Sequence, residues 1–395
     1  EARGMRPAGG IVVPHSRDGE IAPELELIEG DHPVPGAGSL RAASRLGAVV
    51  QGIPAGDDVL VLISGGSTSL LAAPVDGVLP DELRRFFESL LGSGADIVAM
   101  NALRKRVLRW GAGRLAEALQ GRRVHCLVAS DVPGNDPASI GSGPCSPDRL
   151  TARHLSKLIM ERGLEDAVPE SVAAYLQRVI HGSEPETPKA DAPCFRSVHL
   201  AIVLDRAAAV AAATAEARRR GGAPVLRVHQ TLSGDAAVTG ADIARFLADW
   251  RPRAPVDSSG MDASGAAPFA CAVFSGETTV VLPPGSMGRG GRCQELALAT
   301  ARALHRLGPA GRGITVLAAG TDGRDGPTDA AGAIVDASTW SAIAATGLDP
   351  EAALATHDAY PALDRVGALL RTGPTGTNVN DLVIATLVTP APPDT

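Results

Sequence analysis

Aromatic residues and paired cysteines are scarce in this sequence, and each scarcity excludes a class of protein. Aromatic residues make up 3% of the 395 residues, so hydrophobic cores must be mainly aliphatic. The five cysteines show no CxxC spacing, and the nine histidines show neither HExxH nor HxxxH. These spacings argue against a structural zinc site and against a disulfide framework.

Basic clusters and long apolar runs are also scarce. The formal net charge is -7 at pH 7, and the longest basic blocks are the triplets at 104–106 and 218–220. A nucleic-acid-binding surface needs a larger basic patch, so we exclude nucleic acid as a partner. No uncharged apolar run is long enough to span a bilayer, and residues 1–5 lack a signal-peptide pattern, so we expect a cytoplasmic protein without a membrane partner.

Short β-rich apolar runs alternate with alanine-rich amphipathic segments along the chain. This rhythm predicts an α/β protein whose strands are buried in parallel sheets. The expected strands are 11–13, 59–63, 124–128, 200–204, 272–274, 278–282, 315–319 and 382–385, and clear helical segments are 207–220 and 294–307.

A chain of 395 residues suits two domains, and a stretch rich in proline, glycine, serine and aspartate marks the expected boundary. We predict an N-terminal domain at 1–250, a linker at 251–268 and a C-terminal domain at 269–388. Residues 389–395 form a proline-rich tail.

Two polar turns follow predicted strands in the N-terminal domain. The first, with Ser64, Gly65, Gly66 and Ser67, offers backbone N–H groups to an anion, although a plain strand-to-helix turn explains it equally well. The second is the run 130–144, which lies where α/β proteins bind ligands. Its carboxylates and amide suit hydrated Mg²⁺ or a substrate hydroxyl, and its glycines suit an anion; the candidate residues are Asp131, Asn135, Asp136, Ser142 and Gly143.

A predicted helix between these turns carries Asn101, Arg104 and Lys105 close to one face. Two cations and an amide suit the binding of a carboxylate or phosphate. The alternative interpretation is a solvated basic helix face.

Three glycine-rich segments of the C-terminal domain carry further candidates. A turn that opens a helix places arginines at its positive end, which suits an anion. A run with three aspartates in eight positions resembles a calcium loop but lacks the EF-hand glutamate, so we favour magnesium-nucleotide or hydroxyl binding. A last loop beside a strand supplies amides and an acid. The candidates are Gly290, Arg292, Glu295, Asp322, Asp325, Asp329, Asn378, Asn380 and Asp381.

Together these motifs resemble the glycerate 2-kinase family with a C-terminal MOFRL domain, from about residue 30 to residue 388. The most specific matches are GTDGRDGPTDAAG at 320–332, TGPTGTNVND at 372–381, and SDVPGNDP at 130–137 with SGP at 142–144; DHPVP at 31–35 is a further marker. The resemblance implies a large Rossmann-like N-terminal domain and a smaller α/β C-terminal domain, with the active site in the cleft between them.

The resemblance also implies the reaction, in which the γ-phosphoryl group of ATP passes to the 2-hydroxyl of D-glycerate with Mg²⁺ as cofactor. Phosphoryl transfer needs in-line positioning and positive charge near the transferring oxygens. We therefore expect Arg104, Lys105, Arg292 and Asp325 to be catalytic and the other candidates to bind substrate or nucleotide, with Asp322 and Asp329 as Mg²⁺ ligands. A monomer or a homodimer is expected.

The sequence departs from the family pattern at its N-terminus. Family members carry a GxGKA-type turn whose lysine contacts substrate, whereas the first lysine here is Lys105. Further departures are Gly111, Cys293 and the Ser67–Thr68 pair. Two alternatives stay open, a ligand-binding protein and an NAD(P)H-dependent hydroxypyruvate reductase, although the reductase is disfavoured because no strand is followed by GxGxxG with a downstream acid.

Overall fold

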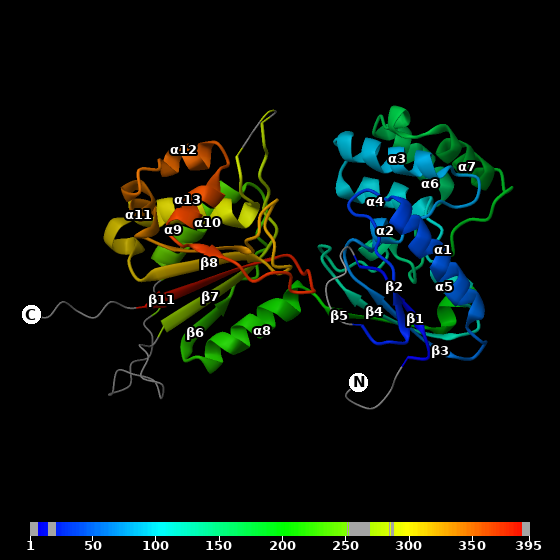
Figure 1. Cartoon of the computed structure of the whole chain (residues 1–395), viewed down its shortest axis with the longest axis horizontal. Coiled ribbons are helices and arrows are strands. Elements are labelled where there is room, and N and C mark those ends of the chain that lie inside the picture. The colour runs from blue at the N-terminus through cyan, green and yellow to red at the C-terminus, as the bar shows by residue number, and fades with distance from the viewer. Residues whose placement is uncertain are drawn as a thin grey trace, which may run out of the picture. The chain divides into compact units, whose positions relative to one another are not determined.

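The computed structural model describes residues 7–14, 21–250, 252, 269–283, 285 and 288–388. The chain forms two compact units, Glu1–Val203 and Leu204–Thr395, each described here by itself (Figure 1). The division precedes the linker expected at 251–268, because β6 (Gly222–Arg227) pairs in parallel with β7 (Phe269–Gly276) in one sheet. The expected linker, apart from Pro252, and the expected tail lie outside the described residues.

A three-stranded sheet forms one part of the first unit. Its order is β3 (Asp58–Ile63), β4 (Arg123–Ala129) and β5 (Val198–Leu204), and β3 and β4 are parallel. Aliphatic side chains from α1 (Ala37–Gly52) and α5 (Arg114–Ala118) pack on one face of this sheet. A short parallel pair, β1 (Gly10–Val12) and β2 (Leu25–Leu27), lies near the N-terminal end of the chain. The predicted strands 59–63, 124–128 and 200–204 are thus confirmed.

The prediction that these strands are buried on both faces is wrong for the other side of this sheet. Leu60 and Leu62 of β3 are 62% and 68% exposed, and Val203 of β5 is 57% exposed. Side chains alternate across a strand, so one set reaches the core under α1 and the other remains exposed in this unit.

A helical layer forms the second part of the first unit. Its helices are α3 (Pro80–Gly92), α4 (Ile97–Arg106), α6 (Ala152–Glu161) and α7 (Glu170–Ile180), and they share one hydrophobic core. Three of the scarce aromatic residues, Phe86, Phe87 and Tyr175, are buried in this core. This layer holds α4, which carries the predicted basic motif.

The second unit is a six-stranded sheet with helices on both faces. The strand order is β10 (Leu369–Leu370), β9 (Gly332–Asp336), β8 (Ile314–Gly320), β11 (Asp381–Val388), β7 and β6. Helix α8 (Arg206–Arg219) packs on β6 and β7, whereas α10 (Arg292–Arg306) lies across β8 and β9 on the opposite face (Figure 1). Helices α9 (Ala236–Asp249), α11 (Thr339–Ala345), α12 (Pro350–Ala355) and α13 (Ala359–Arg365) lie on the α10 side.

The α/β class and the separate C-terminal domain are confirmed, but two details of the second sheet differ from the prediction. The strands expected at 315–319 and 382–385 are β8 and β11, which pair antiparallel rather than parallel. The strand expected at 278–282 is absent among the described residues, where only an isolated bridge joins Thr279 to Asp235. Because β11 runs against β7 and β8, its first residue lies beside their last residues.

Within the described ranges, every helix is too short or too polar to cross a membrane.

Candidate functional site

The loop after β3 is the first candidate anion site. Gly66 has a left-handed backbone (φ 79°), and α2 (Ser67–Leu70) begins directly after it. A Cβ atom on Gly65 would lie 1.9 Å from a carboxylate oxygen of Asp131, so only glycine allows this close approach. Burial raises the pKa of the Asp131 carboxyl. The structure therefore brings two predicted motifs, the Ser64–Ser67 turn and Asp131, into contact.

The glycine turn at 141–143 also meets this loop, but not as a backbone donor. The Ser142 and Thr68 hydroxyls share a hydrogen bond of 2.8 Å. The Ser142 and Gly143 carbonyls accept hydrogen bonds from the N–H groups of Ala112 and Gly113, each at 2.8 Å, and the Gly143 N–H donates to Ile140. The Gly143 N–H group is therefore used within the turn.

The remaining polar residues of the 130–144 run have separate environments. The Asp136 carboxylate accepts from the Ser139 hydroxyl at 2.9 Å and lies 3.5 Å from an Arg149 nitrogen. Asn135 has a left-handed backbone (φ 53°). Asp136 therefore holds the turn in shape.

Arg104 and Lys105 on α4 are both buried, so the alternative of a solvated basic face is wrong. They contact different parts of the unit. The Arg104 guanidinium donates to the Phe87 carbonyl at 3.2 Å and lies 4.8 Å from the centre of the Phe87 ring, and burial lowers its pKa. Lys105 instead forms an ion pair with Asp148 (Nζ–Oδ1 3.0 Å) and lies 3.4 Å from the Ala138 carbonyl. The helix does not bring the two cations together, and Asn101 on the same helix is half-buried.

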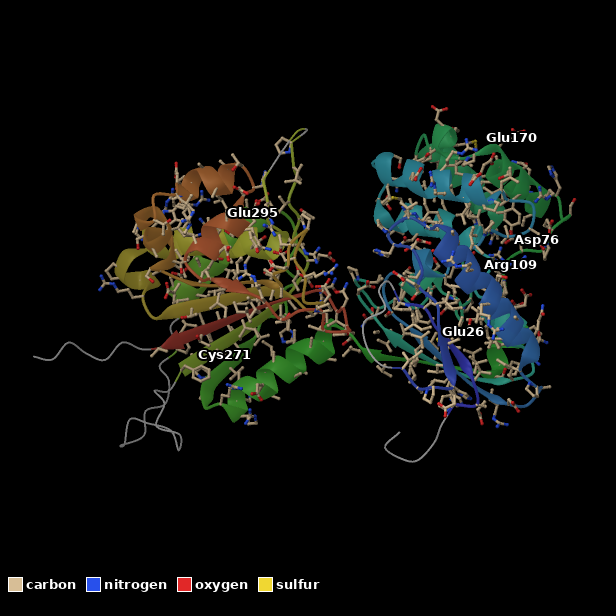
Figure 2. All side chains as sticks on the ribbon, viewed as in Figure 1. Glu26, Asp76, Arg109, Glu170, Cys271 and Glu295 are labelled. Atoms are coloured by element: carbon tan, nitrogen blue, oxygen red, sulfur yellow. The ribbon has the colours of Figure 1, made fainter. Side chains whose placement is uncertain are left out.

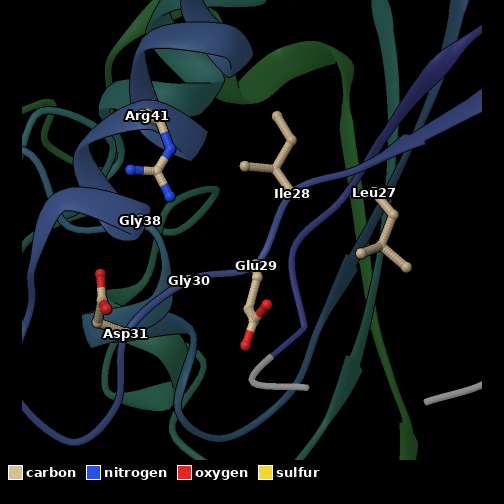
Figure 3. A pocket seen from close by; sticks show the side chains of 7 residues that line it. All are labelled: Leu27, Ile28, Glu29, Gly30, Asp31, Gly38 and Arg41. Atoms are coloured by element: carbon tan, nitrogen blue, oxygen red, sulfur yellow. The ribbon is translucent and has the colours of Figure 1, made fainter. Parts of the chain in front are cut away.

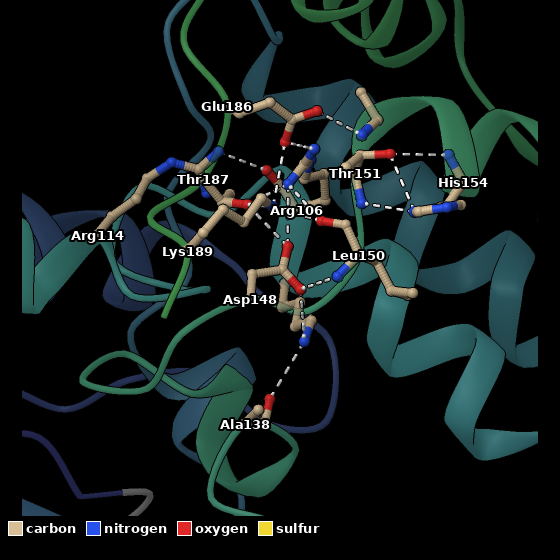
Figure 4. A network of polar contacts seen from close by, with 12 residues as sticks. Arg106, Arg114, Ala138, Asp148, Leu150, Thr151, His154, Glu186, Thr187 and Lys189 are labelled. Carbon is tan, nitrogen blue, oxygen red and sulfur yellow. Dashed lines mark hydrogen bonds and ion pairs between the residues drawn. The ribbon is translucent and has the colours of Figure 1, made fainter. Parts of the chain in front are cut away.

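A buried network surrounds Arg106 and Asp148 (Figure 4), and Asp148 forms the ion pair with Lys105. The next residue, Arg106, is fully buried and contacts Asp148 at 2.9 Å as well as Thr187 and Glu186. Burial disfavours the charge of Asp148, but Lys105 and Arg106 lower its pKa. The network connects α4 to the segment 186–189. It thereby holds the Lys105 ammonium group beside the turn 138–142, which ends at Ser142.

A pocket of about 190 Å³ lies at the start of α1 (Figure 3). It is lined by Leu27, Ile28, Glu29, Gly30, Asp31, Gly38 and Arg41. The Asp31 carboxylate accepts from the Ser39 N–H at 3.0 Å, which already satisfies a donor at this helix end. The pocket lining contains no predicted site residue.

Arg292 is the centre of the candidate site in the second unit. It is the first residue of α10, and its side chain forms a bidentate pair with Asp381 (Nε–Oδ2 2.6 Å, Nη2–Oδ1 3.0 Å). Burial disfavours its charge, but the hydrogen bond with Asp381 raises the pKa of Arg292. The structure thus brings two of the candidate residues together, because the start of α10 lies beside the start of β11.

Asp325 occupies the start of α10. Its carboxylate accepts from the N–H groups of Cys293 (3.1 Å) and Gln294 (2.8 Å), and it is 3% exposed. Burial raises the pKa of Asp325 to about 6. The position at this helix end where the sequence predicts a bound anion is therefore occupied by a carboxylate of the protein itself.

The tentative metal pair, Asp322 and Asp329, does not form a shared site. Asp329 accepts from the Tyr360 hydroxyl (2.6 Å) and from Arg371 (3.0 Å), and these contacts lower its pKa. Asp322 accepts from the Arg324 N–H at 2.9 Å and lies near Gly320, on the side of Asp381. Among the described residues, histidine, cysteine and carboxylate side chains nowhere gather in threes in a way that suits a metal ion.

Glu295 and the glycine turn before α10 are braced by the segment between α12 and α13. Glu295, labelled in Figure 2, is buried on α10 and lies 2.9 Å from Nδ1 of His357. Burial raises the pKa of Glu295 against the opposing effect of His357. The Arg289 N–H donates to the Asp358 carboxylate at 2.7 Å, and Gly290 lies close to the His357 carbonyl. Glu295 therefore supports the turn from within the helix.

The amide side chains of the last glycine-rich loop form hydrogen bonds within the second unit. The side-chain oxygen (Oδ1) of Asn378 accepts from the Asn380 N–H at 3.1 Å, and Asn380 has a left-handed backbone (φ 69°). The Asn380 side chain donates to Glu277 at 2.8 Å.

Sequence reasoning missed two residues that touch the predicted cations, Asp148 and Glu277. Asp148 pairs with Lys105, and Glu277 pairs with Arg292 (Nη1–Oε1 2.9 Å). A signal existed for Glu277, since it directly follows strand β7, where polar residues commonly face a ligand. Asp148 lies in a loop without such a marker.

Two protein families match the chain. Residues 2–177 match a domain of unknown function, DUF4147, and residues 270–381 match the MOFRL family. The MOFRL match contains Arg292, Asp325 and Asp381.

Several known proteins match nearly the whole chain. A glycerate 2-kinase from Pyrococcus horikoshii is 34% identical over 95% of this chain and 81% of its own length. A putative hydroxypyruvate reductase from Agrobacterium vitis is 37% identical over 94% of this chain and 80% of its own length. The crystal structure of a glycerate kinase from Thermotoga maritima is similar, with a TM-score of 0.81 and 35% identity over 96% of this chain and 85% of that one.

Proposed function

The chain belongs to the glycerate kinase family, and on that premise we propose that it transfers the γ-phosphoryl group of ATP to the 2-hydroxyl of D-glycerate. The observation that carries the proposal is the ion-paired arginine at the start of α10 within the MOFRL region. Phosphoryl transfer is catalysed mainly by positioning and by positive charge near the transferring oxygens. Arg292 is a cation whose direction is set by Asp381, and so it has the properties that this reaction requires.

Lys105 is the corresponding cation of the first unit. Its ammonium group is fixed by Asp148, and one of its three N–H donors can contact the carboxylate or a phosphate of a ligand. The Ser64–Ser67 turn, with its left-handed Gly66, is the proposed anion-binding loop of the same unit. Asp131, which lies against Gly65, would orient a ligand hydroxyl there. Arg104 is not assigned to the substrate, because its guanidinium contacts the α3 carbonyl of Phe87.

The proposed cofactor is Mg²⁺ carried by the nucleotide. Mg²⁺ usually binds through one or two carboxylates together with substrate phosphates and water, so three protein ligands are not required. Asp322, which lies near Asp381, fits this role, whereas Asp329 does not because Tyr360 and Arg371 already bind it. Bound Mg²⁺ would neutralise charge on the phosphate oxygens. Asp325 supports Arg292 by holding the first turn of α10 rather than by touching substrate.

An assay with D-glycerate and Mg-ATP tests the proposal. ADP formation shows phosphoryl transfer, and adding enolase without phosphoglycerate mutase separates the two products, because enolase dehydrates only the 2-phosphate. A parallel reaction with hydroxypyruvate and NADH tests the activity suggested by the name of the Agrobacterium relative. Oxidation of NADH without ADP formation would overturn the kinase, and ADP formation with phosphoenolpyruvate appearing only after mutase is added would overturn the 2-hydroxyl as acceptor.

A further inference from the structure

Arg292 is held by two carboxylates from different strands. Asp381 at the start of β11 contacts Nε and Nη2, and Glu277, the residue after β7, contacts Nη1 at 2.9 Å. Nη1 is the one guanidinium nitrogen that Asp381 does not contact. Glu277 therefore contacts the guanidinium nitrogen that Asp381, the more deeply buried of the two carboxylates, does not contact.

Glu277 is itself fixed by two further contacts. Its N–H donates to the Leu232 carbonyl at 3.0 Å, and its second carboxylate oxygen accepts from the Asn380 side chain at 2.8 Å. The Asn380 carbonyl accepts from both the N–H group (3.1 Å) and the hydroxyl (2.7 Å) of Thr321. Glu277 thus links Arg292 to the loops that follow β7 and β8.

Counting donors shows what these pairs leave available. A guanidinium has five N–H groups. Asp381 accepts from two of them, one on Nε and one on Nη2, and Glu277 forms an ion pair with Nη1. Within the part of the chain that the structure describes, this leaves one N–H group on Nη2 and at least one on Nη1. Two N–H groups on the terminal nitrogens can bind two oxygens of a phosphoryl group, provided that the guanidinium does not pivot.

We propose that Glu277 is a positioning residue for Arg292, which it holds so that the two remaining N–H groups meet the transferring phosphoryl group. This inference rests on the proposed function. With Asp381 alone, the guanidinium can pivot about the edge formed by Nε and Nη2, and such a pivot displaces Nη1. A displacement of about 1 Å can slow catalysis about a hundredfold.

Glu277→Gln tests the proposal against a matched control. Glutamine keeps the size of the side chain but removes its charge. It can also place an amide NH₂ group opposite the NH₂ group of Asn380, so that two donors face each other. The control is Glu351→Gln, because Glu351 pairs with Arg302 and Arg306 of the same helix α10 and is 47% exposed, as Glu277 is. We expect kcat to fall at least tenfold in Glu277→Gln with both KM values within twofold, partial recovery in Glu277→Asp, and no change in the control.

The position of Arg292 can also be measured without catalysis. In nuclear magnetic resonance spectra of the full chain, the Arg292 Nε–H signal reports rotation about the Nε–Cζ bond. We expect this rotation to accelerate in Glu277→Gln and to stay unchanged in Glu351→Gln. Unchanged rotation together with wild-type kcat, or a rise in KM alone, would overturn the proposal.

These measurements separate failure of the inference from failure of the function. If the wild type makes no ADP from glycerate, the proposed reaction fails regardless of Glu277. If it does make ADP but Glu277→Gln keeps the wild-type kcat, only the positioning role fails. A loss of kcat that also occurs in Glu351→Gln would mean that any lost charge near α10 has this effect, and would equally overturn the role.

Discussion

Replacing Asp325 with asparagine will remove a pH dependence from the stability of the second unit. The Asp325 carboxylate is 3% exposed and accepts two backbone hydrogen bonds at the start of α10. Burial nevertheless raises its pKa from 3.8 to about 6, and the nearby charge of Asp381 acts in the same direction. The folded unit therefore holds this proton more tightly than the unfolded chain does.

The sign of the effect follows from proton linkage. The unfolded chain releases this proton near pH 4, and the folded unit releases it near pH 6. Between these values the folded state binds more protons, so stability falls as the pH rises through this window. A difference of about two pKa units corresponds to about 3 kcal/mol at 1.36 kcal/mol per unit. Asparagine does not ionise, so the stability of the variant lacks this pH-dependent contribution.

Urea unfolding at pH 4, 5, 6 and 7 measures the effect. A Trp110→Phe background leaves Trp250 and Trp340 as reporters, and both pack in the core of the second unit. The free-energy difference between wild type and Asp325→Asn should shift by about 3 kcal/mol in favour of the variant from pH 4 to pH 7. Asp349→Asn, at the exposed start of α12, controls for the loss of one negative charge. Parallel pH profiles for wild type and Asp325→Asn would refute the reasoning.

Three further changes test the candidate sites. Lys105→Ala should lower kcat/KM for glycerate phosphorylation at least tenfold, or about 1.4 kcal/mol, and wild-type turnover would show that the ammonium is not used. Arg106→Met should lower the unfolding free energy of the first unit by about 3–5 kcal/mol in urea titrations, because it leaves the buried Asp148 with Lys105 alone; a loss below about 1 kcal/mol would contradict this. Gly291→Ala should destabilise the second unit by about 1–3 kcal/mol, since the added Cβ would lie 2.3 Å from Cγ of Asp325, and an unchanged melting temperature would contradict the close approach.

Local signals accounted for much of the fold and part of each site. Apolar runs located strands β3, β4, β5, β8 and β11, and the glycine turn after β3 was found with the left-handed Gly66 that its sequence suggests. The contact between that turn and Asp131 was predictable in kind, because both follow neighbouring parallel strands. The sequence named both Arg292 and Asp381 as site candidates, but it did not predict that the two side chains pair.

The misses arose where a local pattern has several tertiary solutions. The motif after β8 supplies three aspartates, and its composition does not show that Asp325 caps α10, that Asp329 binds Tyr360 and Arg371, or that Asp322 lies near Asp381. Likewise, helical spacing placed Arg104 and Lys105 near one face, but packing directed one toward Phe87 and the other toward Asp148.

By itself, the sequence determined the α/β class, the family resemblance and the residue types of each site, because periodicity, glycine turns and clustered polar motifs are local properties. Only the tertiary structure decided that β11 runs antiparallel between β7 and β8, and so which residues meet at its first position. Strand direction and register depend on pairing between segments that are about 60 to 120 residues apart in the sequence. The partners of Arg292 follow from that pairing, since Asp381 and Glu277 are neighbours only across the sheet.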